Sequence, residues 1–118
     1  MLISLYLGFI LFALMGAAML WQPQYITRLT NVELATPESR NEVRAVYGGF
    51  GVAIALALFI ALVYSPLRAG ICLTTGLALI GMAAGRGYSA WLEWPTSPMI
   101  WGFLIGEAVL GLMIFFQV

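Results

Sequence analysis

Two ionisable residues, Arg86 and Glu107, stand inside long apolar stretches of the sequence. An ionised side chain at the centre of a membrane helix costs about 2.5–3.5 kcal/mol on the insertion scale, so such residues usually pair or serve a site. The guanidinium of Arg86 can hold an anion or a carboxylate through charge-assisted hydrogen bonds. A neighbouring Glu can accept those bonds or carry a proton. These two residue types therefore fit an ion pair, an anion site or a proton relay.

The composition places both residues in a membrane protein. The 118 residues are 63% hydrophobic and 8% charged, whereas soluble domains have roughly 25% charged residues. A soluble chain of this size could not bury so much apolar surface. The net charge is zero, so we expect no nucleic-acid partner. With Cys72 as the single cysteine and no histidine, we expect no metal site, and we expect no cofactor.

Four apolar segments predict an all-α membrane protein: a four-transmembrane-helix up-down-up-down bundle that forms one domain, 1–118. About 20 helical residues cross a hydrocarbon core of about 30 Å. The second helix is predicted to begin at Thr36-Pro37-Glu38, where a cap, a proline and an acid follow one another. The predicted spans are about 2–21, 43–64, 67–91 and 99–116, and the first two are joined by a polar loop, 22–42.

In this topology Arg86 and Glu107 belong to adjacent antiparallel helices and approach the same interface. The Cβ bond of a helical residue tilts toward the helix N-terminus. Arg86 therefore leans into the membrane and Glu107 leans out of it, so that the two side chains lean toward each other. We predict an Arg86–Glu107 ion pair inside the bundle. The alternatives are an Arg86 that extends to the interface without a partner and a neutral Glu107 that pairs helices.

Four further polar residues are candidates for the same ligand-binding cluster. Three of them open the second span and the fourth follows Arg86 by one helical turn. A simple contact with lipid headgroups explains Arg44 equally well. No residue is predicted to be catalytic. These four residues are Glu42, Arg44, Tyr47 and Ser89.

Small residues recur at four-residue spacing in three of the spans, which in lipid allows helix backbones to approach closely. Two of these rows are GxxxG motifs. We predict that they are helix-packing surfaces. Gly48, beside the row of the second span, is predicted to be a packing residue as well. The residues of the rows are Gly49, Ala53 and Ala57 in the second span, Gly81 and Gly85 in the third, and Gly102 and Gly106 in the fourth.

The even number of spans places both termini on one side of the membrane. All the tryptophans map to the opposite side, where they form half of an aromatic belt. The number of Arg residues favours the tryptophan side as cytoplasmic, whereas the tight turn at Arg68 favours the side of the termini. We expect a multi-pass protein of the cell inner membrane with cytoplasmic termini.

Several short motifs resemble those of an uncharacterised bacterial family of short four-span integral membrane proteins, catalogued as a domain of unknown function. The resemblance covers nearly the whole chain. It implies that Arg44, Tyr47, Arg86 and Glu107 are pattern positions, and it implies no activity. The motifs are Glu42-x-Arg44-x-x-Tyr47-Gly48-Gly49, Gly85-Arg86-x-x-Ser89, Ser97-Pro98 and the intramembrane Glu107.

The function most consistent with these features is association without catalysis. The chain would act as a homo-oligomer or as an accessory subunit of a larger membrane complex, and its Arg/Glu/Tyr cluster would bind a lipid headgroup or a partner. The alternative is a proton-coupled small transporter or channel, because a buried Glu beside an Arg can relay protons. An enzyme is the third possibility, by analogy with four-span enzymes that bind glutathione through Arg and Tyr.

Overall fold

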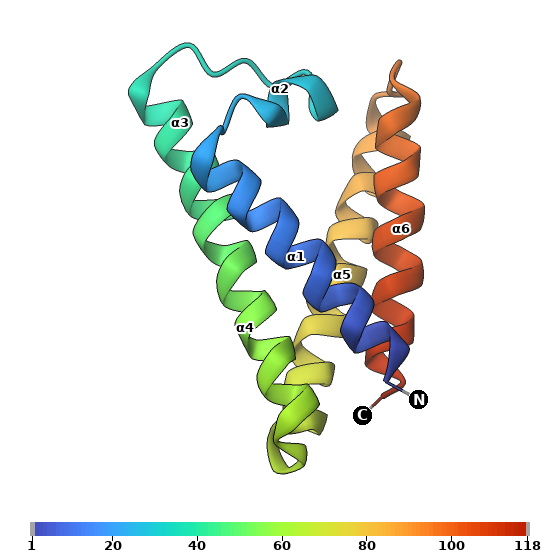
Figure 1. The fold of residues 1–118 in the computed structure, drawn as a ribbon. Helices are drawn as coiled ribbons and strands as arrows, with labels where there is room; N and C mark the ends of the chain where they lie inside the picture. The colour runs from blue at the N-terminus through green and yellow to red at the C-terminus, as the bar shows by residue number, and fades with distance from the viewer. Residues whose placement is uncertain (1, 118) are drawn as a thin grey trace.

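The computed structural model describes residues 2–117 and is all-α, with no strand in that range. Four helices are long and apolar enough to cross a membrane, which confirms the predicted fold class. The second of them is continuous in space but is made of three parts, and a short helix lies in the loop before it (Figure 1). The helices are α1 (Ile3–Trp21), α2 (Tyr25–Thr30), α3 (Pro37–Val43), η1 (Arg44–Gly49), α4 (Phe50–Val63), α5 (Ser65–Leu92) and α6 (Pro98–Phe115).

Local sequence explains where two of the long helices begin. The Thr36 hydroxyl accepts a hydrogen bond from the Ser39 N–H, and the Ser39 hydroxyl accepts one from the Thr36 N–H. This reciprocal capping box, with Pro37 in the first turn, confirms the predicted helix start. Ser97 caps α6 in a similar way, because its hydroxyl accepts from the Met99 N–H.

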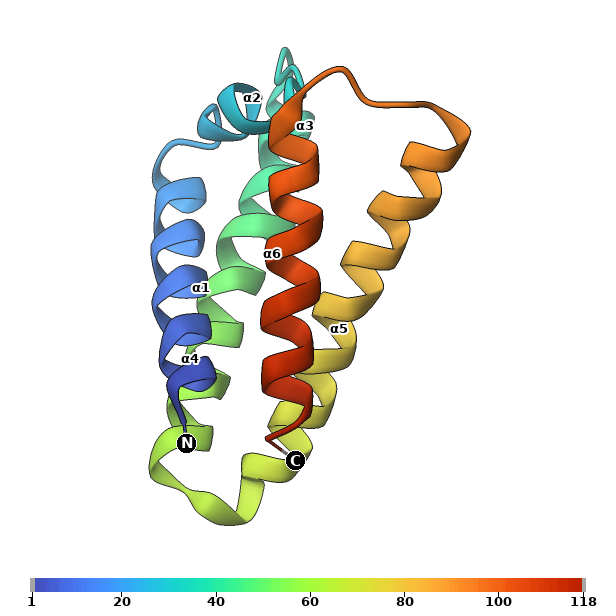
Figure 2. The same ribbon diagram turned by 90° about the vertical axis from the view of Figure 1, so that its right-hand side faces the viewer.

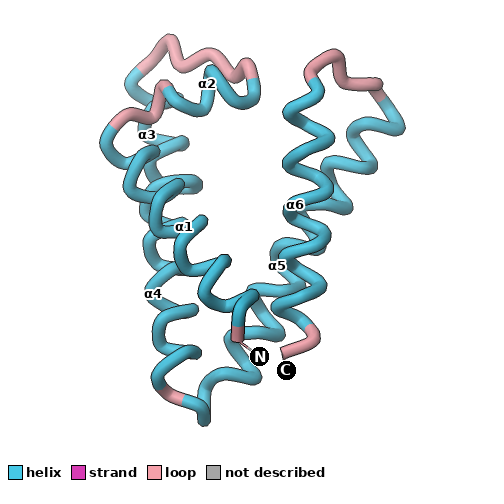
Figure 3. The backbone as a smooth tube through the Cα atoms, turned by 45° about the vertical axis from the view of Figure 1, so that its right-hand side comes forward, coloured by secondary structure: helices cyan, strands magenta, loops and turns pink. Residues whose placement is uncertain are grey.

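The four long helices form two arms. α1 packs along α4 and η1 in the first arm, and α5 packs along α6 in the second. The arms meet at one end of the molecule, the closed end, which holds residues 2 and 117 and the turn from α4 to α5 (Figure 1). They diverge toward the other end, the open end, which holds α2 and the α5–α6 link, residues 93–97 (Figure 3).

All four long helices contribute to one buried core, and it lies toward the closed end. Leu5 of α1, Leu58 of α4, Cys72 of α5 and Ile114 of α6 are completely buried in it. A smaller cluster under α2 contains Met19, Ile26 and Val43 and belongs to the first arm. Within the second arm, α5 and α6 diverge toward the open end, where the link joins them (Figure 2).

Most of the close helix contacts within the chain are made by glycines other than those predicted, and Gly48 is the predicted glycine that does pack closely. A Cβ on Gly16 would lie 2.6 Å from the Val52 nitrogen, and one on Gly76 would lie 2.8 Å from Phe115 Cα. By contrast, nothing lies within 4 Å of the Cβ positions of Gly81, Gly85, Gly102 and Gly106. Gly49 and Ala53 are exposed, and Ala57 is partly buried. These predicted packing residues therefore do not hold the helices of one chain together, and contact with a second chain stays a prediction.

The helix type of η1 was not expected from the sequence. Residues Arg44–Gly49 form a π-helix between two α-helical segments. A π-helix is wider than an α-helix, and such insertions are rare and occur often at functional sites. Here Gly48 is buried against Leu20, whose Cγ would be 2.8 Å from a Cβ at that position. The segment therefore brings the backbone of η1 close to the end of α1.

Candidate functional site

The predicted ion pair is present between the two helices of the second arm. Nε of Arg86 on α5 donates to Oε1 of Glu107 on α6 at 2.6 Å, and Nη2 donates to Oε2 at 3.1 Å. The two side chains are 23% and 12% exposed. This bidentate geometry holds the guanidinium in one plane and satisfies both carboxylate oxygens.

A third residue restrains the guanidinium. The Cζ atom of Arg86 lies 5.2 Å from the centre of the Phe103 ring, which is on α6 one turn before Glu107. A cation over a ring face is attracted by the ring quadrupole, and the attraction is stronger where water is scarce. Arg86 is thus fixed by a carboxylate and a ring, while the N–H groups that Glu107 does not use remain available to another acceptor.

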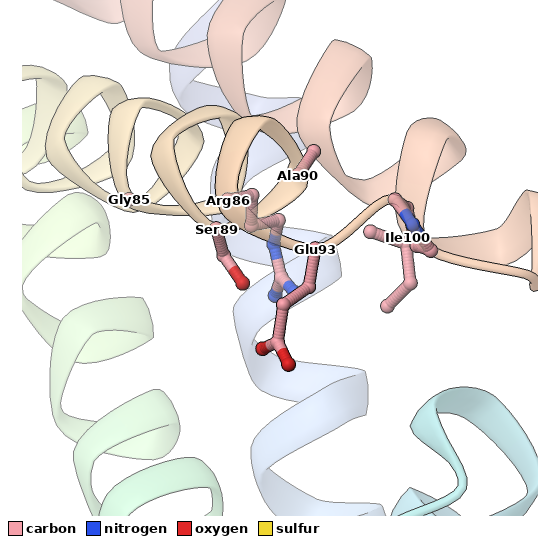
Figure 4. Close-up of a pocket in the computed structure, with 7 residues that line it drawn as sticks. Gly85, Arg86, Ser89, Ala90, Glu93 and Ile100 are labelled. Carbon is pink, nitrogen blue, oxygen red and sulfur yellow. The ribbon is translucent and has the colours of Figure 1, made fainter.

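Those N–H groups lie beside a pocket of about 340 Å³ at the open end of the second arm. Arg86 and Ser89 of α5, and Glu93 directly after the helix, project to the same side (Figure 4). They share this side because they are spaced by three, four and seven residues, close to one and two helical turns. The pocket is lined by Gly85, Arg86, Ser89, Ala90, Glu93, Pro95 and Ile100.

Aromatic residues mark the level of the pocket in the membrane. Trp91 and Trp94 are largely exposed next to Glu93, and the ring of Trp94 lies 5.0 Å from that of Trp101. Tryptophans gather at the boundary between hydrocarbon and headgroups. We therefore expect Glu93 to lie at the interface and the backbone of Arg86, seven residues earlier, to lie about 10 Å deeper.

The residues predicted for this cluster are divided between the two arms. Ser89 lines the pocket with Arg86. Glu42 is exposed on α3, and Tyr47 packs against the small cluster under α2. Within residues 2–117, no hydrogen bond or ion pair joins Arg44 or Tyr47 to the Arg86–Glu107 pair. The predicted single cluster is thus two separate groups, because the arms diverge toward the end where it was placed.

Two other arginines satisfy the carbonyl groups that helices leave free at their C-termini. Nε of Arg44 donates to the Leu20 carbonyl at the end of α1, at 3.2 Å. Arg68 donates to the carbonyls of Ala61 and Leu62 at the end of α4, at 2.7 and 3.3 Å. The last carbonyls of a helix lack partners within it, and cations near them also interact well with the helix dipole. Both arginines therefore stabilise the C-terminal ends of helices.

Sequence reasoning missed Glu93, Pro95 and Ile100 as pocket residues. Glu93 follows Arg86 by seven residues, so the period of the helix could have placed it on the same face. Pro95 and Ile100 reach the pocket only because α5 and α6 separate near their link, and no periodicity in the sequence predicts that separation.

The described residues contain no group of three His, Cys, Asp or Glu side chains close enough to hold a metal ion. The chemistry that the site offers is therefore built from one fixed guanidinium, its carboxylate partner, a hydroxyl and a second carboxylate at the rim. Such a set can bind a polar group that carries hydrogen-bond acceptors.

Neither the curated proteins nor the solved structures contain a match to this chain. One family model does match, and it covers residues 1–118. The chain therefore belongs to the family described as Domain of unknown function (DUF4345).

Proposed function

We propose that this protein is a non-enzymatic membrane protein that binds a lipid headgroup through its phosphate in the pocket above Arg86. The observation that carries the proposal is the guanidinium that Glu107 and Phe103 hold in place beside a pocket near the α5–α6 link. Arginine suits phosphate because its planar fork of N–H groups matches the phosphate oxygens. A donor that is already fixed loses little freedom when a ligand binds.

The position of the pocket favours binding over transport. The pocket is lined by the last two turns of α5, the link and the start of α6. Toward the other end of the molecule, the buried core of Leu5, Leu58, Leu79 and Ile114 fills the space between the arms. A solute would have to pass through this apolar core to cross the membrane, whereas a lipid could reach the pocket from its own leaflet.

The same proposal includes association with other membrane helices. Gly49 and Ala53 in the first arm, and Gly102 and Gly106 in the second, leave small exposed patches on the outer surface. In lipid, close backbone approach over such patches provides van der Waals contact that replaces the hydrophobic driving force. A second copy of the chain or a partner subunit fits these patches.

Native mass spectrometry of protein released in a mild detergent tests both parts. We expect a defined oligomer or complex, and we expect each chain to retain phospholipid. Replacement of Ser89 by Leu fills the pocket without touching the ion pair, so Ser89→Leu should remove most of the retained lipid.

Ala84→Leu is the matched control, because Ala84 is exposed on α5 and does not line the pocket. It adds a similar volume to the same helix and should leave the retained lipid unchanged. Equal lipid content in wild type and both variants would refute binding in the pocket. A bare monomer at all detergent concentrations would refute the association.

A further inference from the structure

We propose that the ligand is a phospholipid whose headgroup carries a primary amine. Its phosphate would bind Arg86, its ammonium group would bind Glu93, and one acyl chain would run along α5 toward the membrane centre. This inference rests on the proposed function and names the chemical class of the lipid. Three features support the inference: the charges at the pocket, the order of Arg86 and Glu93 along the chain, and the exposed surface of α5 between the pocket and the membrane centre.

The charges of the site call for a ligand with both signs. Glu107 already balances the charge of Arg86 through two hydrogen bonds. Glu93 has no cationic partner within 4 Å among residues 2–117, and its side chain lies at the same pocket. With Glu93 and Glu107 ionised, the site has one more negative than positive charge. A phosphate alone would increase that imbalance, whereas a phosphate that bears a cation would not.

The order of Arg86 and Glu93 along the chain matches the order of phosphate and amine in a phospholipid. The phosphate is attached to the glycerol and therefore lies nearer the hydrocarbon than the amine does. Arg86 lies about 10 Å deeper than Glu93 along the helix axis, since seven residues separate them. The side chains of both converge on the pocket between these levels (Figure 4). A lipid in its ordinary orientation thus meets the guanidinium with its phosphate and the rim carboxylate with its amine.

A primary ammonium group fits Glu93 better than a choline does. An ammonium group has N–H donors and forms charge-assisted hydrogen bonds with a carboxylate. A quaternary ammonium group has no N–H donor, and the lining of the pocket contains no aromatic side chain that could hold it by cation–π contacts. A headgroup without an amine, such as glycerol, offers no cation to the carboxylate of Glu93. The phosphate of such a lipid would then be a second anion beside that carboxylate.

The surface of α5 below the pocket suits an acyl chain. A row of small exposed residues descends from the pocket along one side of the helix, and no atom lies within 4 Å of the Cβ positions of its glycines. From Gly85 to Thr74 the row covers about 16 Å, close to half of a hydrocarbon core of about 30 Å. The row consists of Ser89, Gly85, Gly81, Ala78 and Thr74.

The test is a competition measured by native mass spectrometry. Delipidated full-length protein is titrated with phosphatidylethanolamine, phosphatidylcholine and phosphatidylglycerol that have identical acyl chains. We expect wild type to bind phosphatidylethanolamine about three- to tenfold more tightly than the other two, the difference that one partly desolvated charge pair provides. Glu93→Gln should abolish this preference while phospholipid still binds. Glu33→Gln, which removes a Glu in the exposed loop before α3, should keep it.

Two further measurements separate a lipid from a soluble ligand. Glycerophosphoethanolamine has the same headgroup without acyl chains, and it should displace the lipid only at concentrations at least about a hundredfold higher, because apolar burial along the chain is lost. Gly81→Leu should weaken lipid binding by blocking the row, whereas Ala84→Leu, on another side of α5, should not. Gly81 faces open space and Ala84 is exposed, so both variants should fold.

The outcomes distinguish the two proposals. Equal binding of the three lipids, or a preference that survives Glu93→Gln, overturns the inference and leaves lipid binding in the pocket intact. Displacement by glycerophosphoethanolamine at concentrations equal to the lipid overturns the assignment to a lipid. If no phospholipid binds wild type at all, both the inference and the proposed function fail.

Discussion

Each member of the Arg86–Glu107 pair depends on the other to remain in an apolar helix bundle. The two hydrogen bonds neutralise both charges, and Phe103 covers one face of the guanidinium. A buried pair adds little net stability compared with apolar residues of the same volume, because removing two charges from water is costly. Removing only one partner is different, since the remaining charge is then buried without compensation. The proposed lipid site gives the pair a role that stability alone does not.

This difference leads to a prediction at the scale of single residues. Glu107→Leu should lower the free energy of unfolding by about 2–4 kcal/mol, because it strands the Arg86 charge. The double variant Arg86→Met with Glu107→Leu should recover at least half of that loss. Thermal unfolding in detergent, followed by circular dichroism, measures both. Glu33→Leu serves as the control, because Glu33 is exposed in the loop before α3. A double variant less stable than the single one would show that the pair itself stabilises the fold.

The direction of side chains on helices made this pair predictable, and the same reasoning failed for its neighbours. Arg86 and Glu107 lie on antiparallel helices joined by a short link, so the rise of each helix sets their levels and brings them opposite each other. Arg44 and Tyr47 lie in the other arm, and their distance from the pair depends on how two helix pairs pack. Arg44 instead donates to the carbonyl of Leu20 in its own arm. Glu93 could have been found, because only helical periodicity was needed.

At the scale of helices, apolar length and capping residues predicted most of what the structure contains. The start of α3 follows from Thr36 and Ser39, which form a capping box, and from Pro37, which suits the first turn of a helix. The packing faces were not predictable in the same way. Glycines are frequent throughout the chain, and spacing by four occurs on faces that are exposed as well as on faces that are buried. Only the structure tells which glycine faces a neighbouring backbone.

Gly76 faces a neighbouring backbone and Gly102 does not, so replacing each of them by Ala should change the free energy of unfolding in opposite directions. Gly76→Ala should lower the free energy of unfolding by about 1–3 kcal/mol, because the new Cβ would overlap the backbone of Phe115 at 2.8 Å. Gly102→Ala should raise it by about 0.5–1 kcal/mol, because alanine is the better helix former and meets no neighbour within the chain. Thermal unfolding of the two variants in detergent measures the pair of effects.

Gly16→Ala provides a second case in the other arm, where the Cβ would meet backbone atoms of α4 and η1. It should behave like Gly76→Ala. If Gly102→Ala lowers stability in a preparation that is oligomeric and not in a monomeric one, the glycine packs against a second chain. A loss of stability in both preparations would contradict the described packing of α6.

At the scale of the molecule, the division into two arms gives the site its position. The core joins all four helices toward the closed end, so the arms can separate toward the open end. In lipid, the hydrophobic effect does not force four helices together, and their arrangement depends on small differences in packing. Hydropathy therefore predicts the number of spans and their order and does not predict their angles. The pocket near the α5–α6 link is a consequence of those angles.

Four spans with cytoplasmic termini predict the side of the membrane from which each introduced cysteine can be labelled. Single cysteines are introduced by Asn31→Cys in the loop after α2 and by Gln117→Cys near the end of the chain. A membrane-impermeant maleimide should label position 31 from outside intact cells and should label position 117 only after the membrane is opened. This expectation follows from the even number of spans and from cytoplasmic termini. Cys72 is completely buried, so the wild-type chain should remain unlabelled and serves as the control.

The pattern of labelling separates the topology from its orientation, because the two positions lie at opposite ends of the helices (Figures 1 and 2). Exchanged reactivity, with position 117 labelled from outside and position 31 protected, would retain four spans and place the termini outside. The proposed lipid site would then face the cytoplasmic leaflet, and the row on α5 would hold a chain of that leaflet. Labelling of both positions from the same side would contradict four spans, since three long helices separate residues 31 and 117 and only an even number of crossings returns the chain to the same side.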